Sequence, residues 1–163
     1  MPNHVTNILT IEGDKKRVKK LFTFINEPDQ SKKKPDTYID FEKIIPMPPD
    51  IYREDLTSEK EKETGGKNWY RWSINNWGTK WNAYSQSKKG NIIIFKTACA
   101  APFPIIETLS GIFPDLVISI DYADEDIGEN CGTIVFKNKE IMSQYFPPHG
   151  SEEAIEFAEA LHS

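Results

Sequence analysis

Asn91-Ile92-Ile93-Ile94-Phe95-Lys96-Thr97 is the stretch that decides the fold of this 163-residue chain. Four consecutive large apolar residues, Ile92–Phe95, predict a strand that is buried on both faces. The turn residues Lys88-Lys89-Gly90 precede it, and a second strand-like segment, Trp81–Ser85, lies just upstream. Two short strands joined by such a turn are typical of a hairpin. The sequence therefore predicts a central hairpin strand over residues 91–97.

The segments on either side of this hairpin have the same organisation. Val5–Glu12 alternates apolar and polar side chains and predicts a half-buried strand, and Gly13-Asp14 introduces a helix with one apolar stripe. After the hairpin, Pro102 and Pro104 suit a helix start, and Leu116–Tyr122 predicts another strand. This order is the βαββαβ unit of an α+β, ferredoxin-like antiparallel sheet. In that topology Val5–Glu12 and Asn91–Thr97 should be adjacent central strands.

We expect a single domain over residues 1–163, with two additions to this unit. A long insertion, about residues 29–79, follows the first helix; its residues 29–36 are polar and predict a loop. A C-terminal extension, about residues 132–163, adds one strand, Gly132–Lys137, and one helix that begins after Ser151.

Composition limits the classes of function. The net charge is −5, but residues 1–100 carry 18 Lys/Arg and 13 Asp/Glu, whereas residues 101–163 carry 2 and 12. An acidic C-terminal third repels nucleic acid and attracts basic protein surfaces. No apolar run approaches the roughly 20 residues that span a bilayer. The first residues lack the features of a signal peptide, so we expect a cytoplasmic protein with Cys99 and Cys131 as reduced thiols.

All four tryptophans lie between residues 69 and 81, and the densest part of this cluster is Trp77–Tyr84. One interpretation is structural: Trp81 and Tyr84 hold the insertion on the sheet, and Gly78 makes a tight turn. The other is a binding cleft, because a lysine between two tryptophans and a nearby amide suit recognition. The candidate binding residues are Trp77, Lys80, Trp81, Asn82 and Tyr84.

A second candidate surface is the acidic turn after the strand Leu116–Tyr122. Its acidic residues are Asp121, Asp124, Glu125, Asp126 and Glu129. Their spacing does not match a calcium-binding loop, and no histidine or cysteine has zinc-ligand spacing. We therefore expect a solvated acidic surface, without a metal, a cofactor or a catalytic residue.

Nucleic-acid binding is the alternative that this fold class suggests. RNA-recognition sheets stack bases on aromatic residues of the third strand, after a basic residue and a glycine. Lys89-Gly90 is present, but the stacking positions hold Asn91 and Ile93. Base stacking would therefore depend on Trp77, Trp81 or Tyr84 of the neighbouring segment.

Several ordered motifs resemble one family: Met1–Asn7, Phe41–Pro48, Trp77–Tyr84, Phe95–Ala98 with Pro102 and Pro104, and Tyr122–Asp126 followed by Gly128. The family consists of uncharacterised proteins of phages, prophages and plasmids with a ferredoxin-like domain, and it includes the plasmid protein YubB. The resemblance covers roughly residues 1–140. It implies a mobile-element accessory protein and gives no catalytic residue to carry over.

Three functions follow as hypotheses. The first is a non-enzymatic protein that binds a host protein in the bacterial cytoplasm, for example as an inhibitor of a CRISPR or restriction effector with a basic nucleic-acid channel. The second is a nucleic-acid-binding module that uses the cluster Trp77–Tyr84. The third is a small metal-dependent enzyme that uses the acidic turn. The sequence leaves the oligomeric state open.

Overall fold

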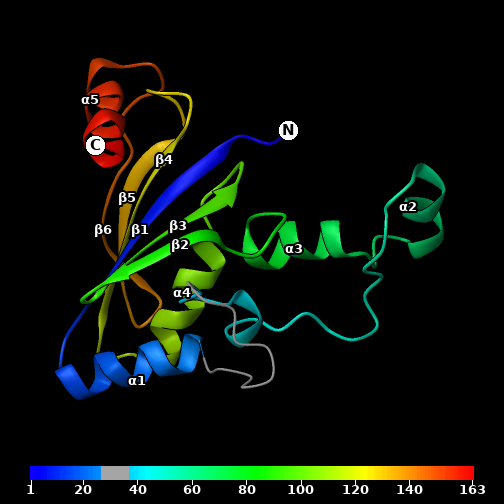
Figure 1. Cartoon of the computed structure of the whole chain (residues 1–163), viewed down its shortest axis with the longest axis horizontal. Helices are drawn as coiled ribbons and strands as arrows, with labels where there is room; N and C mark the ends of the chain where they lie inside the picture. Colours follow the sequence, from blue (N-terminus) through cyan, green and yellow to red (C-terminus); the bar gives the residue numbers. More distant parts are fainter. Residues whose placement is uncertain (27–36) are drawn as a thin grey trace.

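The computed structural model of the chain describes residues 1–26 and 37–163 and has an α+β architecture (Figure 1). The elements in chain order are β1 (His4–Glu12), α1 (Lys15–Ile25), the short 3-10 helix η2 (Phe41–Lys43), α2 (Ser58–Thr64), α3 (Trp69–Trp77), β2 (Tyr84–Lys89), β3 (Ile92–Ala98), α4 (Phe103–Ile112), β4 (Val117–Asp124), β5 (Cys131–Lys137), β6 (Glu140–Tyr145) and α5 (Glu152–His162). The strands form one six-stranded sheet in the order β2-β3-β1-β4-β5-β6. Strands β1 to β4, with α1 and α4, are the ferredoxin-like unit.

The predicted pairing of the two central strands is confirmed. β1 and β3 are antiparallel, with Leu9 opposite Ile93 and Asn7 opposite Phe95. The alternation predicted for β1 is equally clear, because Val5, Asn7, Leu9 and Ile11 are buried while the residues between them are half-buried. The core face of the sheet is thus set by period-2 patterning.

The prediction that Ile92–Phe95 is buried on both faces is wrong. Ile93 and Phe95 are fully buried, whereas Ile94 is 40% exposed and Ile92 is half-buried. The reason is that α1 and α4 cover one face of the sheet only. Successive side chains of β3 therefore point alternately into the core and toward the second, more open face of the sheet.

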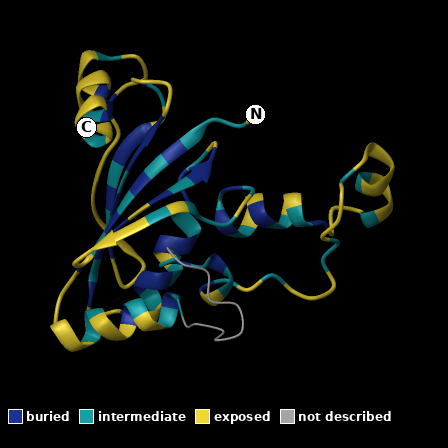
Figure 2. Cartoon of the chain, in the orientation of Figure 1, coloured by how far each residue is buried: buried dark blue, intermediate teal, exposed yellow. Residues whose placement is uncertain are grey.

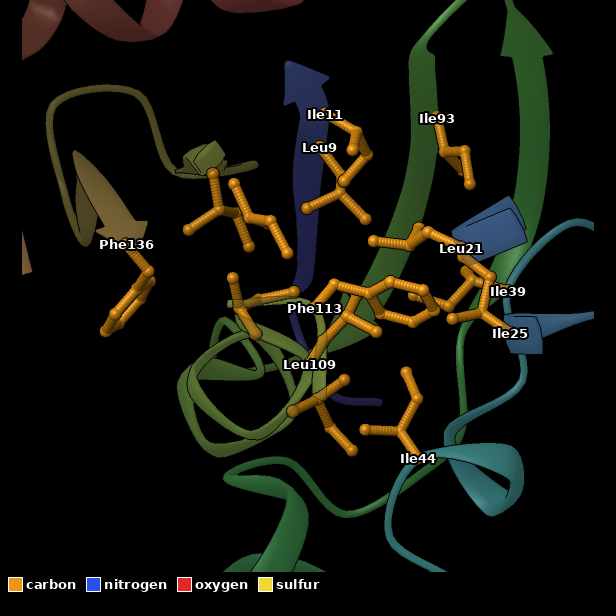
Figure 3. Packing of buried hydrophobic residues seen from close by; sticks show 14 of the residues in the cluster. Leu9, Ile11, Leu21, Ile25, Ile39, Ile44, Ile93, Leu109, Phe113 and Phe136 are labelled. Atoms are coloured by element: carbon orange, nitrogen blue, oxygen red, sulfur yellow. The ribbon is translucent and has the colours of Figure 1, made fainter. Parts of the chain in front are cut away.

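The core lies between the sheet and α1 and α4 (Figure 3). α1 contributes Leu21 and Ile25, and α4 contributes Leu109 with its neighbours Ile105 and Ile106, all of which are fully buried. In Figure 3 the labelled helix side chains Leu21, Ile25 and Leu109 point toward those of the strands. The side chain of Asp14 accepts from the backbone N–H of Lys16 and Arg17 and so fixes where α1 begins.

Within the predicted insertion, residues 29–36 lie outside the described residues, and residues 37–79 hold η2, α2 and α3. Figure 1 shows α2 at the end of a long excursion from the sheet. Figure 2 shows that most of α2 is exposed, whereas the central strands are largely buried.

The C-terminal extension contains one element more than the prediction. Besides β5 and α5 it includes β6, whose six residues are all exposed at the edge of the sheet. α5 lies on the second face, where Ala154 and Ala158 pack against Ala123 and Cys131. This face is therefore covered at one end. In the described residues, no helix is both long and apolar enough to cross a membrane.

Candidate binding surface at one end of the sheet

Both candidate surfaces lie at the end of the sheet where β1 begins. β2 also begins there, and β3 and β4 end there, because neighbouring strands are antiparallel. In Figure 1 the arrowheads of β3 and β4 point to this end. The aromatic segment precedes β2 and the acidic turn follows β4, so the fold brings two distant parts of the sequence to one end of the sheet.

Trp77, the last residue of α3, lies in the core. It is 4% exposed, and its indole N–H donates to the carbonyl oxygen of Ile45 at 2.8 Å. Its ring meets Phe41 and Trp72 edge-on, with centroid distances of 5.7 and 5.3 Å. Trp77, and not Trp81, is thus the tryptophan that holds the insertion on the core, and its edge does not form part of a cleft.

Asn82 serves the internal structure of the insertion. Its Oδ1 accepts from the backbone N–H of Phe41 at 3.0 Å and of Ala83 at 2.9 Å, and its Nδ2 donates to Asp40 Oδ1 at 2.8 Å. These bonds join η2 to the segment before β2. The hydrogen bonds that we expected Asn82 to offer a partner are therefore made within the chain.

Trp81 is on the surface, with 41% of its area exposed. The chain leaves α3 at Gly78, whose φ of 80° favours glycine, and Thr79 Oγ1 then donates to the carbonyl oxygen of Ala98 at 2.7 Å. This bond attaches the segment to the end of β3, and of the next two residues Lys80 is half-buried and Trp81 is exposed. Lys80 Nζ lies 4.5 Å from the centre of the Trp81 ring, in a cation–π contact.

Tyr84 is half-buried and meets His4. The Tyr84 hydroxyl and His4 Nδ1 are hydrogen-bonded at 2.5 Å, and the rings are T-shaped with centroids 5.5 Å apart. Burial raises the pKa of Tyr84, and nearby Cys99 and Glu125 add to this effect. Tyr84 is thus a neutral hydroxyl at neutral pH.

The acidic turn is built around Asp124, which is only 6% exposed. Its Oδ1 accepts from Asn3 Nδ2 at 3.1 Å and from the backbone N–H of Asp126 at 3.0 Å. Asn3 Nδ2 also donates to Asp126 Oδ2 at 2.7 Å, and the backbone N–H of His4 donates to Glu125 Oε1 at 2.8 Å. Asp124 is therefore structural, and the exposed carboxylates of Glu125 and Asp126 are held in place.

The other two predicted acidic residues lie apart from these. Asp121 is within β4 and accepts from the hydroxyl of Thr133 on β5 at 2.5 Å. Glu129 pairs with His149. Within residues 1–26 and 37–163, no group of three or more His, Cys, Asp or Glu side chains is arranged to hold a metal ion.

Two further residues of this site, Asn3 and His4, were missed by reasoning on the sequence. They occur in the opening Met1–Asn7 that resembles the family, and this was the available signal. We call the resulting surface the rim; its residues are Asn3, His4, Lys80, Trp81, Tyr84, Glu125 and Asp126. His4 joins its two halves, because it contacts both Tyr84 and Glu125.

α5 extends the negative charge next to the rim. His162 at its end lies with Nε2 3.1 Å from the carbonyl oxygen of Asp124, and the N–H of Gly150 before it donates to the carbonyl oxygen of Gly128 at 2.8 Å. The helix itself carries four exposed glutamates: Glu152, Glu153, Glu156 and Glu159. The acidic surface is thus larger than the turn that the sequence analysis singled out.

Comparison with known proteins identifies the domain. Residues 77–163 match the family model described as a ferredoxin-like domain in Api92-like protein, in agreement with the predicted fold class. The crystal structure of the protein Api92 from Yersinia pseudotuberculosis is similar, with a TM-score of 0.47 and 15% identity over 69% of this chain and 40% of that one. The chain thus spans less than half the length of that protein. No protein with a curated description matches.

Proposed function

Since this chain belongs to the family of Api92-like proteins through its ferredoxin-like domain, we propose that it is a non-enzymatic binding protein whose rim contacts a basic surface of a partner protein. The observation that carries the proposal is the fixed pair of exposed carboxylates, Glu125 and Asp126. Asn3 and the backbone of His4 already hold them by hydrogen bonds. Carboxylates fixed in this way lose little conformational entropy when a partner binds.

Trp81 supports the proposal from the other half of the rim. Exposed tryptophans are enriched in the residues that dominate binding energy at protein interfaces. The ring is exposed although the segment that carries it is fastened by Thr79 to the end of β3. An aromatic group beside fixed acidic groups suits a partner that has an apolar hollow next to lysines or arginines.

The proposed partner is a host protein that handles nucleic acid, such as a CRISPR or restriction effector. Effectors of this kind carry basic channels for the phosphate backbone. The glutamates of α5 add to the charge of Glu125 and Asp126, so this surface presents an extended field that attracts such a channel. The resemblance to proteins of phages and plasmids makes a mobile element the proposed origin of the chain.

Affinity capture from bacterial lysate, with and without nuclease, tests the proposal. We expect a stoichiometric protein partner that survives nuclease and is released by salt, because exposed charge pairs are screened. The variant Glu125→Lys/Asp126→Lys should lower capture about tenfold. Its control, Glu54→Lys/Glu59→Lys, makes the same change of charge at exposed positions near or on α2.

Two results would contradict the proposal. Equal capture by both double variants would show that the rim is not the binding surface. Capture of nucleic acid alone, lost on nuclease treatment, would instead favour a nucleic-acid-binding module, with Trp81 as the stacking side chain to replace next.

A further inference from the structure

A pocket lies at the opposite end of the sheet from the rim. It has a volume of about 820 Å³ and lies between α1 and the turn that joins β2 to β3. In Figure 1 this turn is above the N-terminal half of α1. The volume is typical of a small-molecule site.

One stripe of α1 forms a wall of this pocket. The stripe consists of Lys15, Val18, Lys19, Phe22 and Thr23, and Asn26, the residue that follows α1, extends it. They recur at the helical period. They lie on a different face of α1 from Leu21 and Ile25, which point into the core. Eleven residues separate the ends of the stripe, or about 16 Å at the rise of a helix. The wall is long enough for an extended nucleoside diphosphate.

The chemistry of the pocket changes along this wall. One end is cationic, with Lys15 and Lys19 one turn apart. The middle is apolar, with Val18 and Phe22 over the buried side chain of Ile11. The far end is neutral and polar, and Thr23, Asn26 and Tyr38 form it. Among the described lining residues, Glu12 is acidic and three lysines are basic, so these residues together carry a net positive charge.

Lys88, the third of these lysines, comes from the opposite wall. Its Nζ lies 4.4 Å from the centre of the Phe22 ring and donates to the carbonyl oxygen of Gly90 at 2.8 Å. An ammonium group has three donors, so Lys88 retains capacity for an anion. Its ammonium group thus lies over the apolar middle of the pocket.

We propose that this pocket binds a nucleoside phosphate. The phosphates lie at Lys15, Lys19 and Lys88, because ammonium groups bind phosphate by charge-assisted hydrogen bonds. The sugar and base lie along Val18 and Phe22, where the base takes the place of Lys88 over the Phe22 ring as Lys88 turns to the phosphates. The polar edge of the base lies at Asn26 and Tyr38. Asn26 Nδ2 donates to the carbonyl oxygen of Thr37 at 2.7 Å, and its second N–H is directed to the base in this proposal. The ligand is distinct from the protein partner of the rim, and each proposal stands without the other.

Calorimetric titration of the full chain with ADP, adenosine and inorganic phosphate tests this proposal. We expect ADP to bind more tightly than either fragment, and backbone amide NMR signals of Val18, Phe22 and Gly90 to shift on addition of ADP. The variant Lys15→Gln/Lys19→Gln should weaken ADP binding about tenfold, as two exposed charge pairs are lost. The matched control is Lys16→Gln/Lys20→Gln, which removes the same charge from exposed positions of α1 outside the pocket.

A third variant, Phe22→Leu, keeps an apolar side chain and removes the ring. It should weaken ADP binding while it leaves the affinity for inorganic phosphate unchanged. The proposal is overturned by any of three results: ADP does not bind, inorganic phosphate binds as tightly as ADP, or the two double variants lose equal affinity. Since all four substituted lysines are at the surface, the circular dichroism spectra of both double variants should match that of the native chain.

Discussion

The ring of His4 at the start of β1 reaches Tyr84 at the start of β2, although β3 lies between these two strands. Their backbones pair with β3 at Ala98 and Lys96 respectively. The two rings still meet edge-on, with a hydrogen bond between His4 Nδ1 and the Tyr84 hydroxyl. The backbone of His4 also binds the side chain of Glu125. The aromatic and acidic candidates of the sequence are thus parts of one surface, with His4 at its centre.

Replacing Tyr84 by phenylalanine should loosen this connection without unfolding the protein. The ring stays, while the hydroxyl partner of His4 is lost, so we expect the free energy of unfolding to fall by about 0.5–1.5 kcal/mol. Urea denaturation measures the loss, and the ring signals of His4 in NMR should move. Tyr70→Phe is the control, because Tyr70 is 40% exposed. Equal effects of the two substitutions would show that the contact between His4 and Tyr84 is not stabilising.

Replacing Trp77 or Trp81 by alanine should lower the free energy of unfolding by very different amounts. Trp77→Ala removes a buried ring with an indole hydrogen bond, and we expect a loss of about 3–5 kcal/mol in the free energy of unfolding. Trp81→Ala removes a ring on the surface with its cation–π contact and should cost no more than about 1 kcal/mol. Thermal or urea denaturation of both variants is the measurement. A larger loss for Trp81→Ala would mean that the roles of these residues are exchanged.

These two residues also show where sequence reasoning ends. The structural interpretation of the sequence assigned Trp81 to the core, whereas the buried ring is that of Trp77, and the local pattern does not distinguish the two. The choice depends on where α3 ends, on the left-handed backbone at Gly78 and on the bond from Thr79 to Ala98. Each of these is a matter of tertiary structure.

The same limit explains the errors in the sheet. Alternation in Val5–Ile11 identified β1, because one face of this strand is packed and the other is more open. The apolar run in β3 has no alternation, so the sequence could not show that Ile94 points away from the core. β6 was missed because all of its residues are exposed at a sheet edge, where burial leaves no pattern. Asn3 and His4 were missed because their roles depend on residues more than 100 positions away in the acidic turn.

Asn82 and Lys80 provide a second matched pair. Asn82→Ala leaves the backbone N–H groups of Phe41 and Ala83 without their acceptor, so we expect the free energy of unfolding to fall by about 1–3 kcal/mol. Lys80→Ala removes a cation–π contact at the surface and should cost no more than about 1 kcal/mol. Urea denaturation separates the two. If Asn82→Ala were as stable as the native chain, its side chain would be free to serve a partner.

Tyr122 should make the chain less stable at alkaline pH. Burial raises its pKa from 10.0 to about 12, and Cys131 adds to the rise. Between these two values the unfolded chain loses the tyrosine proton and the folded chain keeps it. The contribution of Tyr122 to the free energy of unfolding is therefore fully present below pH 10.0, and it is lost as the pH rises toward about 12. The loss is about 1.4 kcal/mol for each pH unit in this window.

The variant Tyr122→Phe isolates this effect from the other tyrosines. Its free energy of unfolding should fall less than that of the native chain as pH rises from about 9 to about 11. Urea denaturation at several pH values gives both curves. Parallel curves would show that Tyr122 has the same pKa in the folded and unfolded chain. That result would contradict the structure, in which Tyr122 is 6% exposed and packs against Phe103.

The two cysteines should differ in reactivity toward iodoacetamide. Both are free, but Cys99 is exposed, whereas Cys131 is buried beneath α5 with its sulfur 3.7 Å from the carbonyl oxygen of Ala154. Burial also raises the pKa of the Cys131 thiol, which lowers the fraction of reactive thiolate. Mass spectrometry of the native chain at neutral pH should therefore find one adduct, at Cys99, and a second adduct only in denaturant.

Weakening α5 by Ser151→Ala, which removes the side-chain acceptor for the N–H of Ala154, should speed modification of Cys131 and leave the rate at Cys99 unchanged. Rapid double modification of the native chain would mean that α5 does not cover this face of the sheet in solution.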